Sequence, residues 1–321
     1  MITGFANQNS HHLTMAGNTH PLNKLAIAPS ATSDGAQGHE DQYVHSVYDQ
    51  IAPHFSQTRY KPWPVIAKFM ESVPTGAIGL DAGTGNGKYL PLSEERYLTM
   101  GVDRSMGLLK FAQHAGESTI PRDVILGDVR DSIWRQGVFD FAISIATIHH
   151  LATPERRVDA IMSILASLAP GGKALIYVWA VEQDELSKRV VPDIIEGNVS
   201  FAKAQDVLVP WVMQQEQKSK SKVNTRRIRK GDHKQEEVQP NSPPPQPSST
   251  HTNTPVFQRY YHLFVAGELT ELAKLAAARL NLAIGPMPVD THASRHQQGV
   301  CISPEGWERS NLYIELTKWL N

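Results

Sequence analysis

The stretch 80-LDAGTGNGKYL-90 decides how the rest of this sequence is interpreted. It joins the apolar run 77–83 to a turn with three closely spaced glycines, Gly83, Gly85 and Gly87. An apolar strand that ends in such a turn is typical of α/β folds, where the backbone of the loop approaches a nucleotide-like ligand. The spacing of the glycines then indicates which ligand is held.

Two common ligands of glycine loops do not fit this spacing. A P-loop needs Ser or Thr after its lysine, because that hydroxyl binds the magnesium beside the phosphates, whereas Lys88 is followed by Tyr89. The dinucleotide fingerprint needs a third glycine where Lys88 stands. The remaining pattern, an acid at Asp81 followed by alternate glycines, suits a cofactor without a pyrophosphate. We therefore predict that the loop binds S-adenosylmethionine.

Two further acids end later apolar runs and support this prediction. Asp103 follows the second run and could accept both ribose hydroxyl hydrogens, while Asp128 follows the third and could accept from the adenine amine. The alternative for each is a turn or a helix cap, both common for Asp. The predicted cofactor residues are Asp81, Gly83, Thr84, Gly85, Asp103, Arg104, Asp128, Val129 and Ile145.

The apolar runs alternate with helical patterns, which predicts an α/β fold with a doubly wound, mostly parallel sheet of about seven strands. The candidate strands are residues 77–83, 97–103, 122–128, 139–147 and 173–180. After them, residues 257–264 and 311–319 are predicted as two more strands of the same sheet. Between those two, residues 267–280 read as an alanine-rich helix.

Two segments lack the apolar residues needed to form a core. Residues 1–38 are predicted to be a disordered tail, and residues 214–255 a disordered insertion that is first basic and then rich in proline and serine. The folded domain, predicted to bind S-adenosylmethionine, is then 39–213 together with 256–321. Seven Lys and Arg residues lie between 218 and 230 without an acid. They could follow a phosphate backbone, or form a solvated linker or a nuclear-import signal.

The composition excludes several protein classes. The formal net charge of −1 over 321 residues gives no global basic signature for nucleic-acid binding. Cys301 is the only cysteine, which excludes an internal disulfide and a cysteine-rich zinc site, so no metal site is predicted. No apolar run reaches the roughly 20 residues that span a bilayer. We expect a cytoplasmic protein, with the nucleus as another possible location.

Several longer stretches resemble one family. These are 43-YVHSVYDQIAPHFSQTRYKPWP-64, 139-FDFAISIATIHHLATPERR-157, 259-RYYHLFVAGEL-269 and 304-PEGWERSN-311. They are similar to the eukaryotic tRNA wobble-uridine methyltransferases, which convert 5-carboxymethyluridine into its methyl ester. The resemblance covers residues 39–321 apart from the insertion. One departure is Thr84, where the family usually has cysteine, and a loop that binds through its backbone tolerates this change.

The resemblance implies two partners. One is the tRNA substrate, and the other is a small zinc-binding protein that activates several methyltransferases as a heterodimer by covering a sheet edge. An exposed edge strand has to be covered or blunted. The third candidate strand would be that edge, so Val124, Ile125 and Leu126 are the predicted contacts, unless helices of this chain bury them.

Methyl transfer to a carboxylate needs no general base, because the carboxylate is already ionised at neutral pH. The site instead needs groups that hold the carboxylate in line with the methyl donor. His149 and His150 end the fourth strand beside the cofactor, and the resemblance favours His150 as the catalytic member, with Arg59 as a second catalytic residue that grips the carboxylate. The predicted substrate-binding residues are Tyr60, Trp63, His149, Trp179, Arg259, Tyr260, Tyr261, His262, Arg309 and Asn311.

Two other functions remain open from the residues alone. One is a methyltransferase for a small quinone or sterol, which would require an apolar lid over the substrate. The other is a catalytically silent methyltransferase fold that serves as a binding scaffold. The glycines and strand-end acids favour a catalyst over a scaffold, and the polar insertion and cationic pocket disfavour an apolar substrate.

Overall fold

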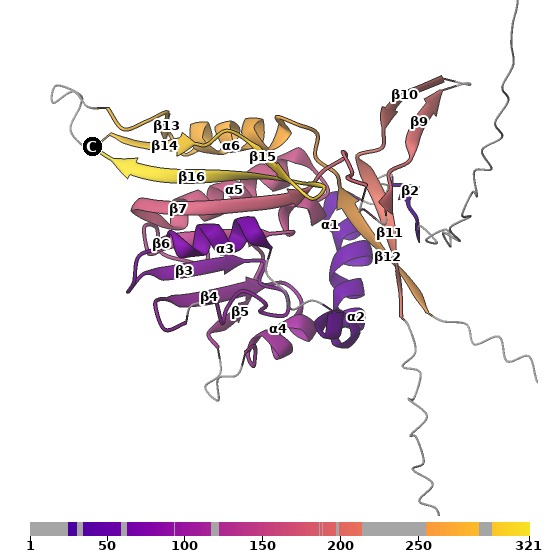
Figure 1. Cartoon of the computed structure of the whole chain (residues 1–321), viewed down its shortest axis with the longest axis horizontal. Coiled ribbons are helices and arrows are strands. Elements are labelled where there is room, and N and C mark those ends of the chain that lie inside the picture. Colours follow the sequence, from indigo (N-terminus) through magenta and orange to yellow (C-terminus); the bar gives the residue numbers. More distant parts are fainter. Residues whose placement is uncertain are drawn as a thin grey trace, which may run out of the picture.

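A single large sheet forms the centre of the computed structural model, which describes residues 25–30, 35–58, 63–92, 94–116, 122–185, 187, 189–196, 199–213, 255–288 and 297–321. Its strands within these residues are β3 (Ile78–Ala82), β4 (Leu98–Asp103), β5 (Val124–Leu126), β6 (Phe139–Ile145), β7 (Leu168–Trp179), β13 (Ala283–Ile284), β14 (Gln298–Ile302), β15 (Gly306–Glu308) and β16 (Asn311–Leu320). The order is β13-β14-β16-β7-β6-β3-β4-β5, with β15 paired to β16 (Figure 1).

The central strands are parallel, as the sequence predicts. β3 pairs in parallel with β4 and β6, and β6 pairs in parallel with β7. In β6 every residue except Asp140 is buried, because helices cover both faces of the sheet. β16 is antiparallel to β7, so the sheet is mixed at this side. The predicted α/β class and the five predicted strands are confirmed.

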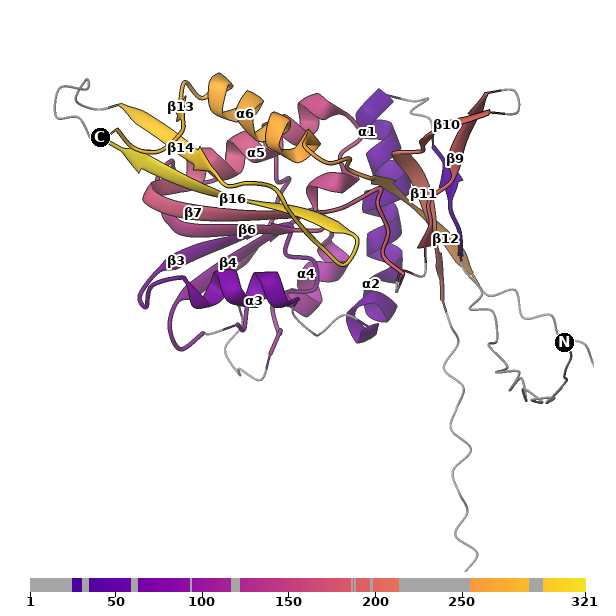
Figure 2. The same cartoon turned by 45° about the horizontal axis from the view of Figure 1, so that its top comes forward.

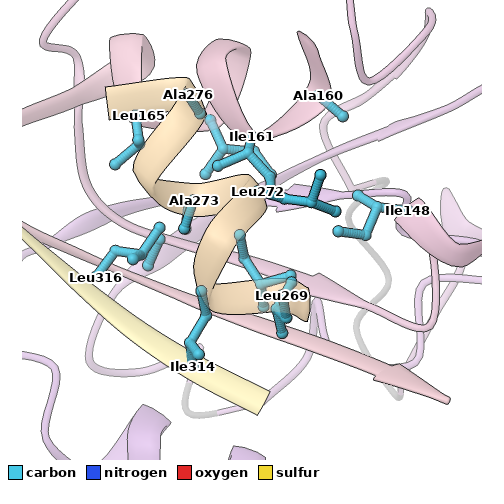
Figure 3. Close-up of a cluster of buried hydrophobic side chains, with 14 of the residues drawn as sticks. Ile148, Ala160, Ile161, Leu165, Leu269, Leu272, Ala273, Ala276, Ile314 and Leu316 are labelled. Atoms are coloured by element: carbon cyan, nitrogen blue, oxygen red, sulfur yellow. The ribbon is translucent and has the colours of Figure 1, made fainter. Parts of the chain in front are cut away.

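Helices α5 (Pro154–Ser167) and α6 (Glu268–Arg279) cover one face of the sheet. Figure 3 shows the apolar side of α6 between α5 and strand β16, where Leu272 lies near Ile161 and Leu269 lies near Ile314. Thr153 begins α5 by accepting a hydrogen bond from the backbone of Arg156. The other face is covered by α3 (Pro64–Glu71), and the short helix α4 (Met106–Ala112) follows β4 (Figure 2).

A nearly continuous helix stands across the carboxyl ends of the central strands (Figures 1 and 2). It consists of α1 (Gly35–Glu40), a π-helical turn η1 (Asp41–His45) and α2 (Ser46–Thr58). Single π turns inside helices are frequent at functional sites. The buried carboxylate of Glu40 attaches this helix to the core, because it accepts hydrogen bonds from Arg156 and from the backbone of Ala152.

Smaller sheets lie on the outer side of this helix (Figure 1). β12 (Val256–His262) pairs with β11 (Asp206–Val212), which pairs with β2 (Ala28–Pro29). β1 (Leu25–Ala26) pairs with β8 (Arg189–Val190), and β9 (Asp193–Glu196) pairs with β10 (Val199–Lys203).

One strand assignment from the sequence is wrong. The predicted strand 257–264 does not join the central sheet, because β12 pairs with β11 in the outer sheet and its buried Tyr260 packs against the apolar side of α2. β14 is the strand that extends the central sheet beyond β16. The predicted strand 311–319 is β16, and the predicted helix 267–280 is α6.

Regular structure also begins earlier than the predicted boundary after residue 38. β1 and β2 lie between residues 25 and 29, and α1 begins at Gly35. The rest of the predicted tail and residues 214–254 of the predicted insertion lie outside the described residues. Within the described part of the chain, no helix is long and apolar enough to cross a membrane.

Candidate active site

One cavity lies where the central strands end, beneath the N-terminal helix and β12. Its wall next to β3, β4, β5 and the end of β6 contains eight of the nine predicted cofactor residues: Gly83, Thr84, Gly85, Asp103, Arg104, Asp128, Val129 and Ile145. Its wall next to β6, β7 and β12 contains His149, His150, Trp179, Arg259 and Tyr261. Carboxyl ends of parallel strands are where such sheets bind their ligands.

The glycine loop combines close packing with an open approach to its backbone. Gly83 has a φ of 89°, and a Cβ at this position would lie 2.1 Å from Oγ1 of Thr147. Gly85 has a φ of 57°, but a Cβ there would meet nothing within 4 Å. Because Gly85 lines the cavity, a ligand can approach its backbone directly. This geometry fits the amino-acid portion of S-adenosylmethionine.

Asp103 is held ready to accept hydrogen bonds. The backbone N–H of Gly85 donates to Oδ2 of Asp103 over 2.8 Å, and that of Ser105 donates to Oδ1 over 2.8 Å. Burial raises the pKa of Asp103, although these backbone donors oppose the shift. A carboxylate fixed in this way retains free lone pairs on both oxygens, as binding a ribose diol requires.

Asp81, the ninth predicted cofactor residue, is not among the described residues that line the cavity. It lies beneath the loop, where the Thr84 hydroxyl donates to Oδ2 over 2.8 Å and Oδ1 has no hydrogen-bond partner. Burial raises the pKa of Asp81 to about 7. Its visible contact supports the loop through Thr84, so direct contact with a ligand stays a prediction.

Asp128 is already tied to two arginines. Its carboxylate lies 2.7 Å from Arg130 and 3.3 Å from Arg104. Burial alone would raise the pKa of Asp128, but the hydrogen bonds and charge of Arg130 outweigh burial and lower it. Arg130 also donates to Gln37 of α1, so this acid links the sheet to the N-terminal helix. An adenine amine would have to share the carboxylate with these groups.

The two histidines follow β6 in a single 3₁₀ turn, η2 (Ile148–His150), and their side chains have different partners. The backbone N–H of Trp179 donates to Nδ1 of His149 over 3.1 Å, and Nε2 of His149 has no partner. His150 has both nitrogens engaged: Nδ1 lies 2.7 Å from the carbonyl oxygen of Tyr260, and Nε2 lies 3.0 Å from the Tyr48 hydroxyl. Burial lowers the pKa of His150 to about 3, so it is neutral at physiological pH.

Aromatic rings and Arg259 complete this side of the cavity, and Arg189 packs on one of the rings. The rings of Trp179 and Tyr261 stack with centroids 4.1 Å apart and an angle of 8°. The Arg189 guanidinium lies 3.7 Å from the centre of the Trp179 ring, and the Arg259 guanidinium lies 5.2 Å from that of Tyr261. Stacked rings and planar guanidinium groups are the surfaces on which single nucleic-acid bases are held.

The cavity contains about half of the predicted catalytic and substrate-binding residues. Those that line it are Trp63, His149, His150, Trp179, Arg259 and Tyr261. Four others are not among its described lining residues. Tyr260 and His262 both contact Asp206. Arg309 lies in the turn between β15 and β16, and Asn311 begins β16 and donates from its amide to the carbonyl of Arg309. Arg59 and Tyr60 lie outside the described residues.

The sequence prediction missed the contribution of the N-terminal helix. Val44, His45 and Tyr48 line the cavity, as does Lys88 of the glycine loop. The Tyr48 hydroxyl also lies 3.2 Å from that of Tyr261, so it joins His150 to the aromatic wall. The helical pattern of residues 43–58 shows an apolar side, but nothing in its periodicity shows that this side faces a ligand cavity.

Comparison with known proteins is consistent with this geometry. The family described as "Methyltransferase domain" matches residues 80–176. The chain is 38% identical to the tRNA (carboxymethyluridine(34)-5-O)-methyltransferase of Schizosaccharomyces pombe over 75% of this chain and 91% of that protein. It is 46% identical to the Saccharomyces cerevisiae protein of the same name over 58% of this chain and 61% of that protein. The fold matches the CcbJ methyltransferase of Streptomyces caelestis with a TM-score of 0.55 and 14% identity, over 86% of this chain and 98% of that one.

Proposed function

Because the chain belongs to the family of tRNA (carboxymethyluridine(34)-5-O)-methyltransferases, we propose that its cavity holds the methyl donor beside the glycine loop and the wobble uridine beside the histidines. The protein is a methyltransferase that depends on S-adenosylmethionine and forms the methyl ester of carboxymethyluridine in tRNA. The observation that carries the residue assignments is that both groups of residues line one cavity. One wall contains the strand-end acids and glycines, and the other contains the buried histidines and Arg259.

In this proposal the wall that contains the glycine loop, Asp103 and Asp128, here called the cofactor wall, binds S-adenosylmethionine and orients it. S-adenosylmethionine supplies an electrophilic methyl group on a sulfonium. Asp103 accepts from the ribose hydroxyls, the backbone around Gly85 lies along the amino-acid portion, and Asp128 faces the adenine amine. The two backbone donors that fix Asp103 support its assignment to the ribose hydroxyls. The open space beside Gly85 supports the place of the amino-acid portion.

The wall that contains the two histidines, Trp179, Arg259 and Tyr261, here called the substrate wall, has to align the substrate carboxylate with the methyl group. It does not have to remove a proton from that carboxylate. One carboxylate oxygen of the uridine substituent forms the new O–CH₃ bond, the S–CH₃ bond breaks, and its electron pair stays on sulfur. No proton is transferred, which agrees with a His150 whose pKa of about 3 leaves it neutral. Within this wall His150 acts on the substrate through Tyr48, and Trp63, Trp179 and Tyr261 enclose the base. Arg59 remains a proposed carboxylate contact.

The experiment that tests the proposal combines labelled S-adenosylmethionine, tRNA bearing 5-carboxymethyluridine and the activator protein, followed by nucleoside analysis. Two variants separate the two walls. His150→Ala should lose methyl transfer while keeping its affinity for the cofactor, and Asp103→Ala should weaken cofactor binding first. Normal turnover by His150→Ala would refute the role of His150, and undiminished cofactor affinity in Asp103→Ala would refute that of Asp103.

The activator protein is proposed to pair with β5. This strand ends the sheet, and two of its side chains are exposed, Ile125 at 39% and Leu126 at 52%. Val124 instead packs partly against the small cluster of Leu90, Leu109 and Ala112. A short edge strand with exposed apolar side chains is suited to cover by another chain. Leu126→Glu should therefore lose copurification with the activator, whereas Leu275→Glu, on the equally exposed Leu275 of α6, should not.

The tRNA is proposed to contact the basic segment 218–230 as well as the cavity. That segment lies outside the described residues, so its seven cations support the proposal by charge alone. Contacts with phosphates weaken steeply as salt rises. Deleting residues 217–250 should reduce tRNA affinity and flatten its salt dependence. Unchanged affinity after the deletion would leave the segment as a linker.

A further inference from the structure

Arg259 is a buried cation that lacks an anionic partner. It lies in β12 with 4% of its surface exposed and lines the cavity. Its guanidinium contacts the ring faces of Trp211 and Tyr261. In the described part of the chain, no carboxylate forms an ion pair with it, and its Nε has no hydrogen-bond partner. A buried guanidinium left in this state is costly unless an anion binds beside it.

His149 lines the same cavity and carries a buried hydrogen-bond donor that has no partner among the described residues. Its ring is fully buried, and Nδ1 accepts the backbone N–H of Trp179. The proton of the neutral ring therefore lies on Nε2, which has no partner. The pKa of His149 lies well below its usual value because of burial and, next, the positive charge of neighbouring groups that include Arg259. His149 therefore stays neutral and can donate one hydrogen bond, from Nε2.

His150 cannot take the same role in this arrangement. Its Nδ1 donates to the carbonyl of Tyr260, so Nε2 carries no proton and accepts from the Tyr48 hydroxyl. Neither ring nitrogen is left to donate to a ligand. His150 is a positioning residue that orients Tyr48, and the two adjacent histidines differ because their Nδ1 atoms meet opposite backbone groups, a carbonyl for His150 and an N–H for His149.

We propose that His149 and Arg259 form an anion subsite that receives the substrate carboxylate and selects the acid over the corresponding amide. Both groups can only donate, and a carboxylate can only accept. An amide has only one accepting oxygen, so its NH₂ group would face one of these donors, and the Arg259 charge would stay uncompensated. This inference rests on the proposed function, and it assigns the acid specificity of that site to two residues.

The subsite also fits the change of charge during the reaction. The carboxylate loses its negative charge when the new O–CH₃ bond forms, so the product ester attracts Arg259 less than the substrate does. Arg259 therefore contributes to binding and orientation of the acid and favours release of the ester. Both effects depend on burial, because a solvated ion pair is worth little.

The test uses the full chain with its activator and two anticodon stem-loop RNAs, one with carboxymethyluridine and one with carbamoylmethyluridine at the wobble position. Binding of each RNA and methyl transfer to the acid are measured for Arg259→Gln, His149→Phe and His149→Gln. We expect Arg259→Gln and His149→Phe to lower the preference for the acid roughly 10- to 100-fold. His149→Gln, which keeps an N–H at a similar place, should recover part of the preference. Arg279→Gln, on the half-exposed Arg279, is the matched control and should change nothing.

Cofactor affinity on the same preparations shows that each variant is folded. If Arg259→Gln does not fold, the two His149 variants decide. An unchanged preference in folded Arg259→Gln or His149→Phe would overturn the subsite, even where the parent protein methylates the acid RNA. If the parent protein methylates neither RNA, the proposed function itself fails, so the two failures are distinguishable.

Discussion

The attachment of the N-terminal helix to the core depends on one buried carboxylate. Glu40 is fully buried, and its oxygens accept from Arg156 Nε over 2.6 Å and from the Ala152 N–H over 2.7 Å. Arg156 is itself largely buried, with 15% of its side chain exposed. Replacing Glu40 with Ala removes all of these acceptors at once and leaves a guanidinium and a backbone N–H without them.

The expected cost follows from these contacts. Breaking a buried ion pair by removing one partner typically costs about 3–5 kcal/mol. Arg156 keeps the Gln37 side chain as an acceptor over 2.7 Å and keeps some contact with water, which places the cost at the lower end. We therefore expect Glu40→Ala to lower the free energy of unfolding by about 3 kcal/mol, which is more than a hundredfold in the folding equilibrium.

Urea unfolding followed by circular dichroism measures this change. The control is Asp159→Ala, which removes a pair with Arg279 whose two side chains are 46–47% exposed. Exposed pairs contribute little, so that variant should stay within about 1 kcal/mol of the parent. If Glu40→Ala unfolded at the same urea concentration as Asp159→Ala, the argument that this carboxylate attaches the helix would be refuted.

Three further predictions concern the loop and the cavity. Gly87→Ala should destabilise the protein more than Gly85→Ala in thermal unfolding, because both have positive φ but a Cβ at Gly87 would lie 2.6 Å from the Ala112 Cα; equal melting temperatures would contradict this. Asp81 keeps its proton up to about pH 7 when folded but loses it near pH 4 when unfolded, so its contribution to stability falls as pH rises through that window. As pH rises between these limits, the parent should lose about 1.4 kcal/mol of stability per pH unit relative to Asp81→Asn, which cannot titrate. If the difference in unfolding free energy between the two proteins, measured in urea, did not change with pH, the raised pKa of Asp81 would be wrong. Tyr48→Phe should cost about 1–2 kcal/mol because Nε2 of His150 loses its donor, and it should reduce methyl transfer without changing cofactor affinity in calorimetry.

The grouping of the glycine loop with Asp103 and Asp128 in one cavity wall could be predicted because its signals are local. The glycines of the loop lie within five residues of one another, and Asp103 and Asp128 each end an apolar run that is itself a strand. In a parallel sheet the carboxyl ends of neighbouring strands meet at one edge, so strand periodicity was enough to bring these residues together. The order of the five strands, with β5 at the edge, follows from the same topology.

The opposite wall of the cavity, where we propose that the substrate binds, could be predicted only in part. The pair His149 and His150 stood out at a strand end, but Tyr48 did not, since a tyrosine in an amphipathic helix usually packs in the core. Arg259 and Tyr261 were expected on a strand of the central sheet, whereas β12 lies in the outer sheet and carries them to the cavity from the opposite side. Tyr260 and His262, which alternate with them along the strand, contact Asp206 instead.

The sequence by itself determined the α/β fold and placed the glycine loop, Asp103 and Asp128 together at one edge of the sheet, because both depend on periodicity and spacing within short segments. It also determined the family, through the resemblance of several longer stretches. Only the tertiary structure decided which histidine has a free donor, because that depends on whether each Nδ1 meets a backbone carbonyl or a backbone N–H. For His150 the partners Tyr48 and Tyr260 are 102 and 110 residues away. Contacts over such separations are made by packing of the whole domain, and no local pattern records them.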